Sequence, residues 1–193
     1  MRIINNMLQT KKRPRSFFWQ EVFDFLKILT VTLIIFFGIS RFLIRPIRIE
    51  GNSMFPTLKD SSLGVSNVAG RNADGLDRFE IVIIYLADRN EYLVKRVIGL
   101  PGETIAYTNG QLTVDGKRYE ERFLDDAYVS TYGGSFMTDV RPITLGPDEY
   151  YCLGDNRPNS RDSRFYGPFT GAQIVAKGAF ILLPFSEAGL KSW

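Results

Sequence analysis

An apolar stretch near the N-terminus limits most strongly what this chain can fold into. It covers residues 28–39, and only Thr30, Thr32 and Gly38 interrupt its hydrophobic side chains. Twelve helical residues span only about 18 Å, whereas the hydrocarbon core of a membrane is about 30 Å thick. Extension to residues 22–43 gives a helix of about 33 Å, so the sequence predicts a transmembrane helix over that range.

The charges are distributed unevenly around this stretch. Residues 1–48 carry nine Lys or Arg and two acids, whereas the remainder carries fifteen and nineteen. Basic residues before an apolar helix favour a cytoplasmic N-terminus. We therefore expect a basic cytoplasmic leader over residues 1–21, a single-pass anchor in the cell membrane over 22–43, and an extracytoplasmic body over 44–193. The lipid bilayer is then one partner. Basic runs do not recur in the body, which argues against nucleic-acid binding.

Two other interpretations of the apolar stretch stay open. It also has the length of a signal-peptide core, but the first alanine of the chain is Ala69, so no Ala-x-Ala cleavage site follows. The best substitute, Gly38-Ile39-Ser40, is followed directly by Arg41. Alternatively, the stretch is a buried helix of a soluble fold. Lys27 and Arg41 lie near the ends of the longer range, where such side chains reach the membrane interface.

Composition removes several classes of catalytic site. The chain has no histidine and a single cysteine, Cys152. Catalysis by Ser-His-Asp or Cys-His is therefore excluded, as are an intrachain disulfide and a Cys-rich zinc site. We expect neither a metal nor a cofactor. A hydrolase built on this chain needs a base other than histidine.

The body shows the sequence patterns of short β-strands. Residues 81–86 form a continuous apolar run, residues 93–98 alternate in part, and Ala87–Asn90 fits the turn of a hairpin between them. Asn109-Gly110 and Asp115-Gly116 are strong hairpin signals. Further strands are expected at residues 46–50, 103–107, 111–114, 117–119, 149–153 and 174–183.

These patterns define the expected fold class. No convincing amphipathic helix follows residue 50, so we expect a mostly β catalytic domain, an antiparallel sheet or open barrel, behind a single N-terminal transmembrane helix. Residues 120–147 are polar and aromatic. They fit an inserted loop or lobe, whose limits we place at about residues 107–147.

Three segments of the body contain candidate chemistry. Gly51–Leu58 places Ser53 between a strand end and a turn braced by proline. Tyr92–Glu103 places Lys95 within an apolar strand, where burial lowers the pKa of an amine. Gly154–Pro168 is dense in polar groups that can support a site. Each segment alone also fits an interpretation without a catalytic role, namely a surface loop or an edge strand with a solvated lysine.

Taken together, the three segments resemble the type I signal peptidase family. That family has a serine in S-M-x-P-T-L, a lysine in K-R-V-x-G-x-P-G-E and a loop G-D-N-R-x-N-S-x-D-S-R, and all three occur here in that order. The resemblance implies a membrane-anchored serine endopeptidase that removes signal peptides from preproteins after small residues, at Ala-x-Ala sites. It implies a Ser-Lys dyad that forms an acyl-enzyme. The sequence leaves the oligomeric state open, but nothing in it demands more than a monomer, so we expect a monomer.

The resemblance also assigns roles by position. Ser53 matches the nucleophile, Lys95 the general base and Ser160 the serine that orients the lysine. The same motif loop supplies supporting residues, and the small pocket for the residue before the cleaved bond is lined by apolar ones. The supporting residues are Asp155 and an Asp162–Arg164 ion pair; the pocket residues are Met54, Leu58 and Leu93.

The chain departs from the family pattern at Gly51, where some members have a serine that helps to hold the oxyanion. The backbone N–H of Ser53 must then contribute more. The substrate is expected to add as a strand beside Leu93 and the segment 63–67.

Three alternative functions stay open at this point. A Ser-Lys peptidase with a narrower task, for example on pilins or in conjugation, would carry the same motifs. Self-cleaving repressors share the chemistry, but the chain shows neither an internal cleavage site nor a DNA-binding head. An inactive membrane-anchored binding module is the alternative from a different class.

Overall fold

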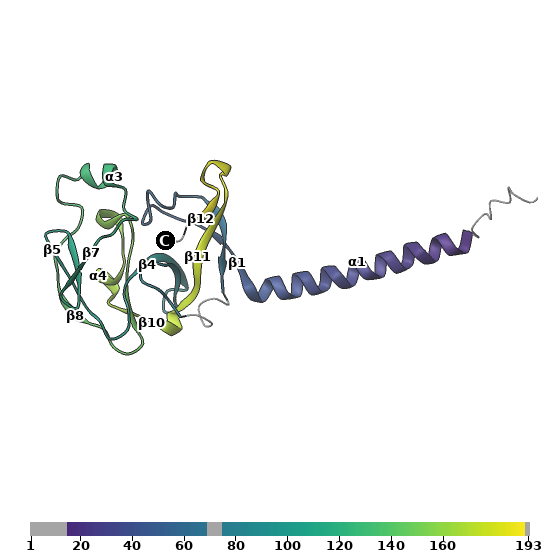
Figure 1. The fold of residues 1–193 in the computed structure, drawn as a ribbon, viewed down its shortest axis with the longest axis horizontal. Helices are drawn as coiled ribbons and strands as arrows, with labels where there is room; N and C mark the ends of the chain where they lie inside the picture. Colours follow the sequence, from purple (N-terminus) through teal and green to yellow (C-terminus); the bar gives the residue numbers. More distant parts are fainter. Residues whose placement is uncertain (1–14, 69–74, 192–193) are drawn as a thin grey trace, which may run out of the picture. The chain divides into compact units, whose positions relative to one another are not determined.

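The computed structural model describes residues 15–68 and 75–191. It consists of two compact units that divide between Arg41 and Phe42. Most of the leader expected over residues 1–21 lies outside the described residues. The first unit contains one helix, and the second unit, the body, contains all the strands (Figure 1).

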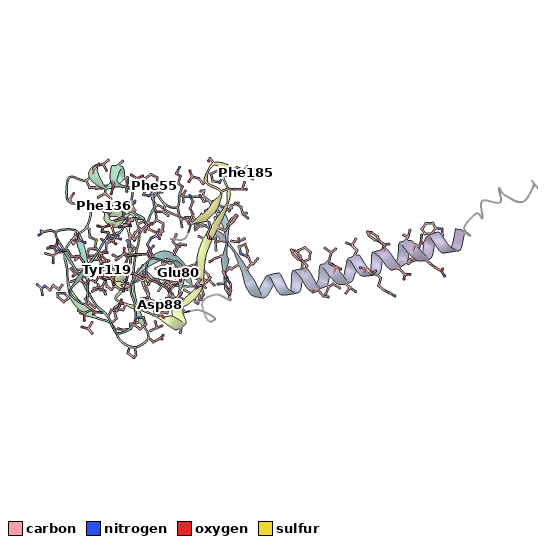
Figure 2. The ribbon with its side chains drawn as sticks, in the orientation of Figure 1. Phe55, Glu80, Asp88, Tyr119, Phe136 and Phe185 are labelled. Carbon is pink, nitrogen blue, oxygen red and sulfur yellow. The ribbon has the colours of Figure 1, made fainter. Side chains whose placement is uncertain are left out.

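Helix α1 (Arg15–Leu43) is 29 residues long. The sequence has no proline between Pro14 and Pro46, so nothing interrupts the backbone hydrogen bonds of this range. Its apolar side chains are exposed, for example Phe23 at 67% and Ile34 at 66%, and they line the helix in Figure 2. Within the part of the chain that the structure describes, no helix combines the length and apolar character needed to cross a membrane. The transmembrane helix expected over residues 22–43 therefore stays a prediction.

The body is mostly β, and all its described strand pairs are antiparallel. This confirms the expected class, although the sheets do not close into a barrel. The larger sheet has eight strands in the order β1-β2-β11-β3-β4-β9-β10, and β12 pairs with β11. Its strands are β1 (Ile44–Arg48), β2 (Leu63–Asn67), β3 (Ile81–Leu86), β4 (Glu91–Gly99), β9 (Glu149–Leu153), β10 (Phe169–Thr170), β11 (Ile174–Leu183) and β12 (Gly189–Lys191).

A second sheet of four strands, in the order β7-β6-β5-β8, forms a lobe on one side of the body. Asn109 and Asp115 adopt positive φ angles of 50° and 49° ahead of their glycines, as tight hairpin turns require. The elements of this lobe are β5 (Thr104–Thr108), β6 (Gln111–Val114), β7 (Lys117–Tyr119), the short helix α3 (Asp126–Ser130) and β8 (Val140–Thr144). Neither α3 nor α4 (Ser163–Tyr166) was predicted, because a helix of one turn has no periodicity to detect.

The alternative of an edge strand with a solvated lysine is correct only in part. Strand β3 pairs along β4, but β9 pairs with β4 only from Arg96 onward, and the Lys95 side chain is buried rather than solvated. One expectation about strands is wrong. Strand β2 pairs with β1 on one side and with β11 on the other. Its backbone groups are therefore already used, and the segment 63–67 offers no edge to a substrate strand.

Three apolar clusters form the core of the body. One lies beneath the second sheet, one lies around β3, β4 and β9, and one holds the segment that contains Ser53. The third cluster includes Met54 and Leu58, each only 1% exposed, and Ile81 of β3. Met54 precedes Pro56 and Leu58 follows it, and both side chains are buried in this core. The Ser53 segment is therefore fixed to the larger sheet.

Candidate active site

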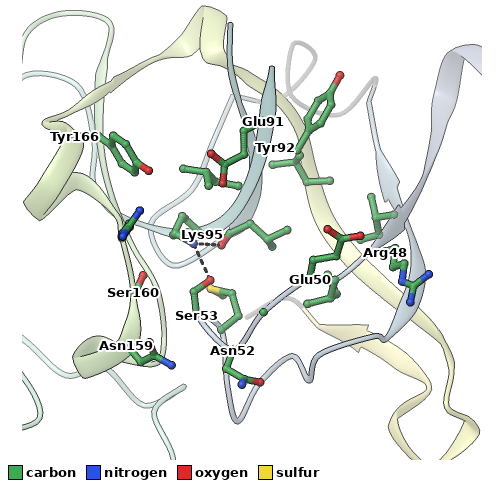
Figure 3. A pocket seen from close by; sticks show the side chains of 18 of the residues that line it. Arg48, Glu50, Asn52, Ser53, Glu91, Tyr92, Lys95, Asn159, Ser160 and Tyr166 are labelled. Carbon is green, nitrogen blue, oxygen red and sulfur yellow. Dashed lines mark hydrogen bonds between the residues drawn. The ribbon is translucent and has the colours of Figure 1, made fainter. Parts of the chain in front are cut away.

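A cleft of about 1060 Å³ opens on the body beside the larger sheet (Figure 3). One wall is the segment 45–54, and the other is residues 90–95 at the start of β4. Residues 158–161 border it on a third side. Ser53 and Lys95 point toward each other in the cleft.

The Ser53 segment is a tight turn held by its own backbone. Phe55 N–H donates to the Asn52 carbonyl at 3.1 Å, and Leu58 N–H donates to the Met54 carbonyl at 2.9 Å. Among the described residues, the N–H of Ser53 itself has no hydrogen-bond partner. A free backbone donor beside a serine hydroxyl is suited to stabilising negative charge on an oxygen bound there.

Lys95 lies 2.8 Å from Ser53, measured from Nζ to Oγ, and Nζ donates to the Val94 carbonyl at 2.9 Å. Its side chain is only 2% exposed. Strand β4 turns alternate residues to opposite faces, so Lys95 faces the cleft and Arg96 the interior on the other side. The sequence left open which of the two shares an apolar face, and the structure buries both.

Burial lowers the pKa of Lys95 from 10.5 to about 8. The negative charges of Asp162 and Asp155 oppose this effect, but loss of solvation is larger. At pH 8 about half of the amine is therefore free base. The free amine can accept the Ser53 proton across the same 2.8 Å contact.

Asp162 and Arg164 form the ion pair expected from the motif. Arg164 donates through Nε and Nη2 to the two carboxylate oxygens, both at 2.8 Å. Gly154 N–H donates to the same carboxylate at 3.0 Å. Although burial alone raises the pKa of Asp162, these bonds hold it below its ordinary value. Because Arg164 takes both oxygens, Asp162 acts on Lys95 only at a distance.

Ser160 borders the cleft, but it forms no direct bond to Lys95 in this structure. Its Oγ is buried and has no hydrogen-bond partner among the described residues. A Cβ atom placed on Gly154 would lie 2.2 Å from this Oγ and 2.4 Å from the Ser53 carbonyl oxygen. Only glycine therefore allows the serine segment and the 154–164 loop to approach so closely.

Asp155 lies on the interior side of the site. Arg96 donates to both its oxygens, at 2.9 and 2.7 Å, and Thr57 Oγ1 donates to Oδ2 at 2.6 Å. Arg96 and Asp155 are 2% and 1% exposed. Asp155 thus ties the turn after Ser53 to strand β4, and it makes no contact with the Lys95 amine.

The three predicted pocket residues differ in whether they line the cleft. Met54 and Leu93 line the cleft, whereas Leu58 does not. Leu58 packs in the cluster that includes Met54 and Ile49. It contributes to the pocket only by supporting Met54 from behind.

Sequence reasoning missed several residues that hold the site in place. Arg157 is buried and donates to the Glu121 carboxylate at 2.6 Å and to the Gly154 carbonyl at 3.0 Å. Asn156 donates to the carbonyls of Asn52 and Ser53. The run of polar residues from 154 to 164 signalled a network, but Glu121 lies 36 positions from Arg157 and Asn52 lies 104 positions from Asn156. No local pattern shows such pairs.

Comparison with known proteins gives a consistent result. A family model described as "Signal peptidase, peptidase S26" matches residues 22–183. Signal peptidase IB of Staphylococcus aureus (strain COL) is 34% identical over 178 residues, which cover 87% of this chain and 93% of that protein. Signal peptidase I of Bacillus amyloliquefaciens is 36% identical over 169 residues, with coverage of 86% and 90%.

A crystal structure of a signal peptidase I from Enterococcus faecalis V583 is 29% identical and covers 53% of this chain and 96% of that one, with a TM-score of 0.49. The family model and the two sequence relatives each extend over most of the chain. The chain therefore belongs to the type I signal peptidases of peptidase family S26, which are serine peptidases that remove signal peptides.

Proposed function

We propose that this enzyme cleaves preproteins with a Ser-Lys dyad, in which Ser53 is the nucleophile and Lys95 the general base. One observation carries the proposal: Lys95 is 2% exposed, and its amine lies 2.8 Å from the Ser53 hydroxyl. Burial lowers the pKa of the amine so that it can act as a base near neutral pH, and the contact lets it accept the proton of the Ser53 hydroxyl.

The reaction then proceeds in two steps. Ser53 Oγ gives its proton to Lys95 and attacks the peptide carbonyl, and the Ser53 N–H stabilises the oxyanion. The C–N bond breaks as Lys95 returns the proton to the leaving amine, which leaves an acyl-enzyme. A water molecule, deprotonated by Lys95, attacks the ester and releases the signal peptide and Ser53. Each proton that Lys95 accepts is given back within the same step.

The cleft suggests how the substrate is held. In the described strands, β9 pairs only with the Arg96–Gly99 half of β4, so the edge of residues 91–95 faces the cleft. An extended peptide can pair with this edge and lie between it and the segment 48–52. Its alternate side chains then face the floor formed by Met54 and Leu93. These large residues leave space for small side chains, consistent with Ala-x-Ala sites.

The membrane anchor over residues 22–43 is part of the proposal. Four consecutive residues of α1, Ile34 to Phe37, are between 55% and 66% exposed. Four successive residues of a helix point around its whole circumference, so the apolar surface is continuous rather than confined to one face. A lipid bilayer matches such a surface, and the basic residues before it favour a cytoplasmic N-terminus.

The decisive experiment compares wild type, Ser53→Ala and Lys95→Ala on a preprotein with an Ala-x-Ala site, in detergent, from pH 6 to 10. Wild type should cut after the second alanine, with kcat/KM rising tenfold per pH unit and levelling off above about pH 8. Both variants should lose at least about 10³-fold activity. Retained cleavage in Lys95→Ala, or a pH profile that continues to rise to pH 10, would show that Lys95 is not the base.

Two further substrates complete the design. A preprotein with Leu in place of the second Ala should not be cut if Met54 and Leu93 limit the pocket. Pilin-type precursors cut in preference to ordinary preproteins would indicate a specialised peptidase. Folded wild type that cuts neither substrate would leave the binding module as the better explanation.

A further inference from the structure

The peptide group between Asn52 and Ser53 is held from the interior side. Asn156 Nδ2 donates to the Asn52 carbonyl at 2.9 Å, and the backbone N–H of Asn156 donates to the Ser53 carbonyl at 3.0 Å. Asn156 is 4% exposed and does not line the cleft, whereas Asn52 and Ser53 do. One buried residue thus fixes two successive carbonyls of the serine segment.

The direction of the Asn52 carbonyl determines the direction of the Ser53 N–H. These two groups belong to one peptide unit, which is trans, so they point to opposite sides of the chain. When Asn156 holds the carbonyl toward the interior, the N–H points away from it. Asn52 and Ser53 line the cleft, whereas Asn156 does not (Figure 3), so an N–H that points away from Asn156 is directed to the cleft side.

The side-chain amide of Asn156 must itself be oriented, because only its NH₂ end can donate to Asn52. Tyr128 of α3 supplies this restraint, since its hydroxyl donates to Asn156 Oδ1 at 3.1 Å. The Tyr132 hydroxyl lies 2.9 Å from that of Tyr128 and can donate to it. Burial and this neighbour raise the pKa of Tyr128 to about 12, so its phenol keeps the proton at working pH.

The rings reinforce the same connection. Tyr128 contacts Phe55 edge to face at 5.0 Å between centroids, and Phe55 is two residues after Ser53. On its other side Tyr128 contacts Phe136, which is 6% exposed. The lobe therefore reaches the serine segment both through a chain of hydrogen bonds and through packed rings.

We propose that Asn156 and Tyr128 are positioning residues that aim the Ser53 N–H into the cleft as the donor to the oxyanion. The inference rests on the proposed function of Ser53. It assigns to the inserted lobe an indirect part in the chemistry. Tyr128 of α3 orients the Asn156 amide, and Asn156 orients the Asn52–Ser53 peptide, whose N–H stabilises the transition state. Such a donor is worth most when it is fixed before the reaction begins.

The test uses the full-length enzyme in detergent with Tyr128→Phe and Asn156→Asp. Tyr128→Phe keeps the ring contacts and removes only the hydroxyl, so kcat should fall about fivefold with little change in KM. Asn156→Asp keeps the shape but cannot donate to Asn52, so kcat should fall about 10²-fold. Tyr119→Phe, on β7 and outside this network, is the matched control and should behave as wild type.

A transition-state mimic separates positioning from general damage. A peptidyl boronic acid with alanine before the boron adds the Ser53 oxygen and places a negatively charged oxygen where the oxyanion forms. Its Kd should rise in each variant by the factor that kcat/KM falls, while the Kd of the cleaved signal peptide stays constant. The thermal midpoint of Tyr128→Phe should stay within about 2 °C of wild type.

The outcomes distinguish the two proposals. Folded wild type that cuts neither the ordinary preprotein nor the pilin-type precursor would overturn both. Wild type that cuts normally while Tyr128→Phe and Asn156→Asp also keep full kcat would overturn only the positioning role. The same holds if kcat falls but boronate affinity is unchanged, or if the change appears in KM alone.

Discussion

Holding Lys95 in the interior costs folding free energy whenever its amine is protonated. Its pKa in the folded state, about 8, lies below the ordinary value of 10.5. Between these pH values the unfolded chain binds more protons than the folded chain, so stability rises with pH in that window. Below about pH 8 both states are protonated and the full cost, about 3 kcal/mol, is present.

Lys95→Met should therefore stabilise the enzyme while it abolishes cleavage. We expect the unfolding free energy at pH 7 to rise by about 3 kcal/mol, and the gain should shrink from pH 8 and disappear near pH 10.5. Urea unfolding in detergent at several pH values measures this difference. Lys117→Met, at an exposed position of β7, should change stability by less than about 0.5 kcal/mol at every pH. A loss of stability in Lys95→Met at pH 7 would mean that the amine is not desolvated.

How far single residues could be predicted depends on the range of their interactions. Ser53, Lys95 and the Asp162–Arg164 pair were found because their signals are short motifs. Asp162 and Arg164 are only two positions apart. Arg96 and Asp155 are 59 positions apart, and Asn156 is 104 from Asn52. The sequence shows that these residues are polar, but only the fold brings them together.

Strand β4 supplies both the lysine of the cleft and the arginine of the buried ion pair behind it. Lys95 faces the cleft on one side, and on the other Arg96 forms its buried pair with Asp155, which also accepts from Thr57. The guanidinium also lies over the Phe123 ring at 4.1 Å and donates to the Phe79 carbonyl. Removal of the carboxylate leaves a buried cation without its counter-charge.

Asp155→Asn should therefore destabilise the body by about 3–5 kcal/mol and lower kcat, because the turn after Ser53 loses its anchor. Chemical unfolding and cleavage rates give the two readouts. Glu120→Gln is the matched control, because it breaks the Arg122–Glu120 pair, whose side chains are 79% and 76% exposed. That change should cost less than about 1 kcal/mol. Equal effects of the two substitutions would contradict a clamping role for Asp155.

Elements were predictable where a local pattern defines them. Residues 81–86, 111–114 and 117–119 were expected as strands, and the structure has β3, β6 and β7 at these bounds. Strands β10 and β12 have two and three residues, too few for alternation to show, and neither follows a hairpin signal such as the Asp115-Gly116 that precedes β7. Beyond the β3–β4 hairpin, the order of the larger sheet was not predictable, since β11 inserts between β2 and β3 through pairs 90 to 120 positions apart.

At the scale of the whole molecule, the two units have different tasks in this proposal. All three core clusters and the entire cleft lie in the body, beyond Phe42. Among the described residues, the Lys95 amine forms hydrogen bonds with Ser53 and Val94, which both belong to the body. In the proposed function, the body therefore contains what folding and chemistry need, and the helix is assigned the task of holding the enzyme at the membrane.

A variant reduced to residues 42–193 tests this division. It should fold with a thermal midpoint close to that of the intact enzyme and cut a short soluble Ala-x-Ala peptide at a kcat/KM within about threefold, since no site contact is lost. On a preprotein inserted in lipid vesicles, cleavage at low enzyme concentration should fall by about 10²-fold or more, because the helix no longer raises the local concentration. The variant should also leave the membrane fraction.

A replacement of the helix gives the matching control. An unrelated single-pass apolar segment fused before Phe42 should restore cleavage of the preprotein in vesicles, because the proposed task needs only attachment to the bilayer. If the truncated body cuts the vesicle-bound preprotein as fast as the intact enzyme, attachment contributes nothing. If it fails on the soluble peptide although folded, α1 has a part in the chemistry itself, and the assignment of all catalytic groups to the body is wrong.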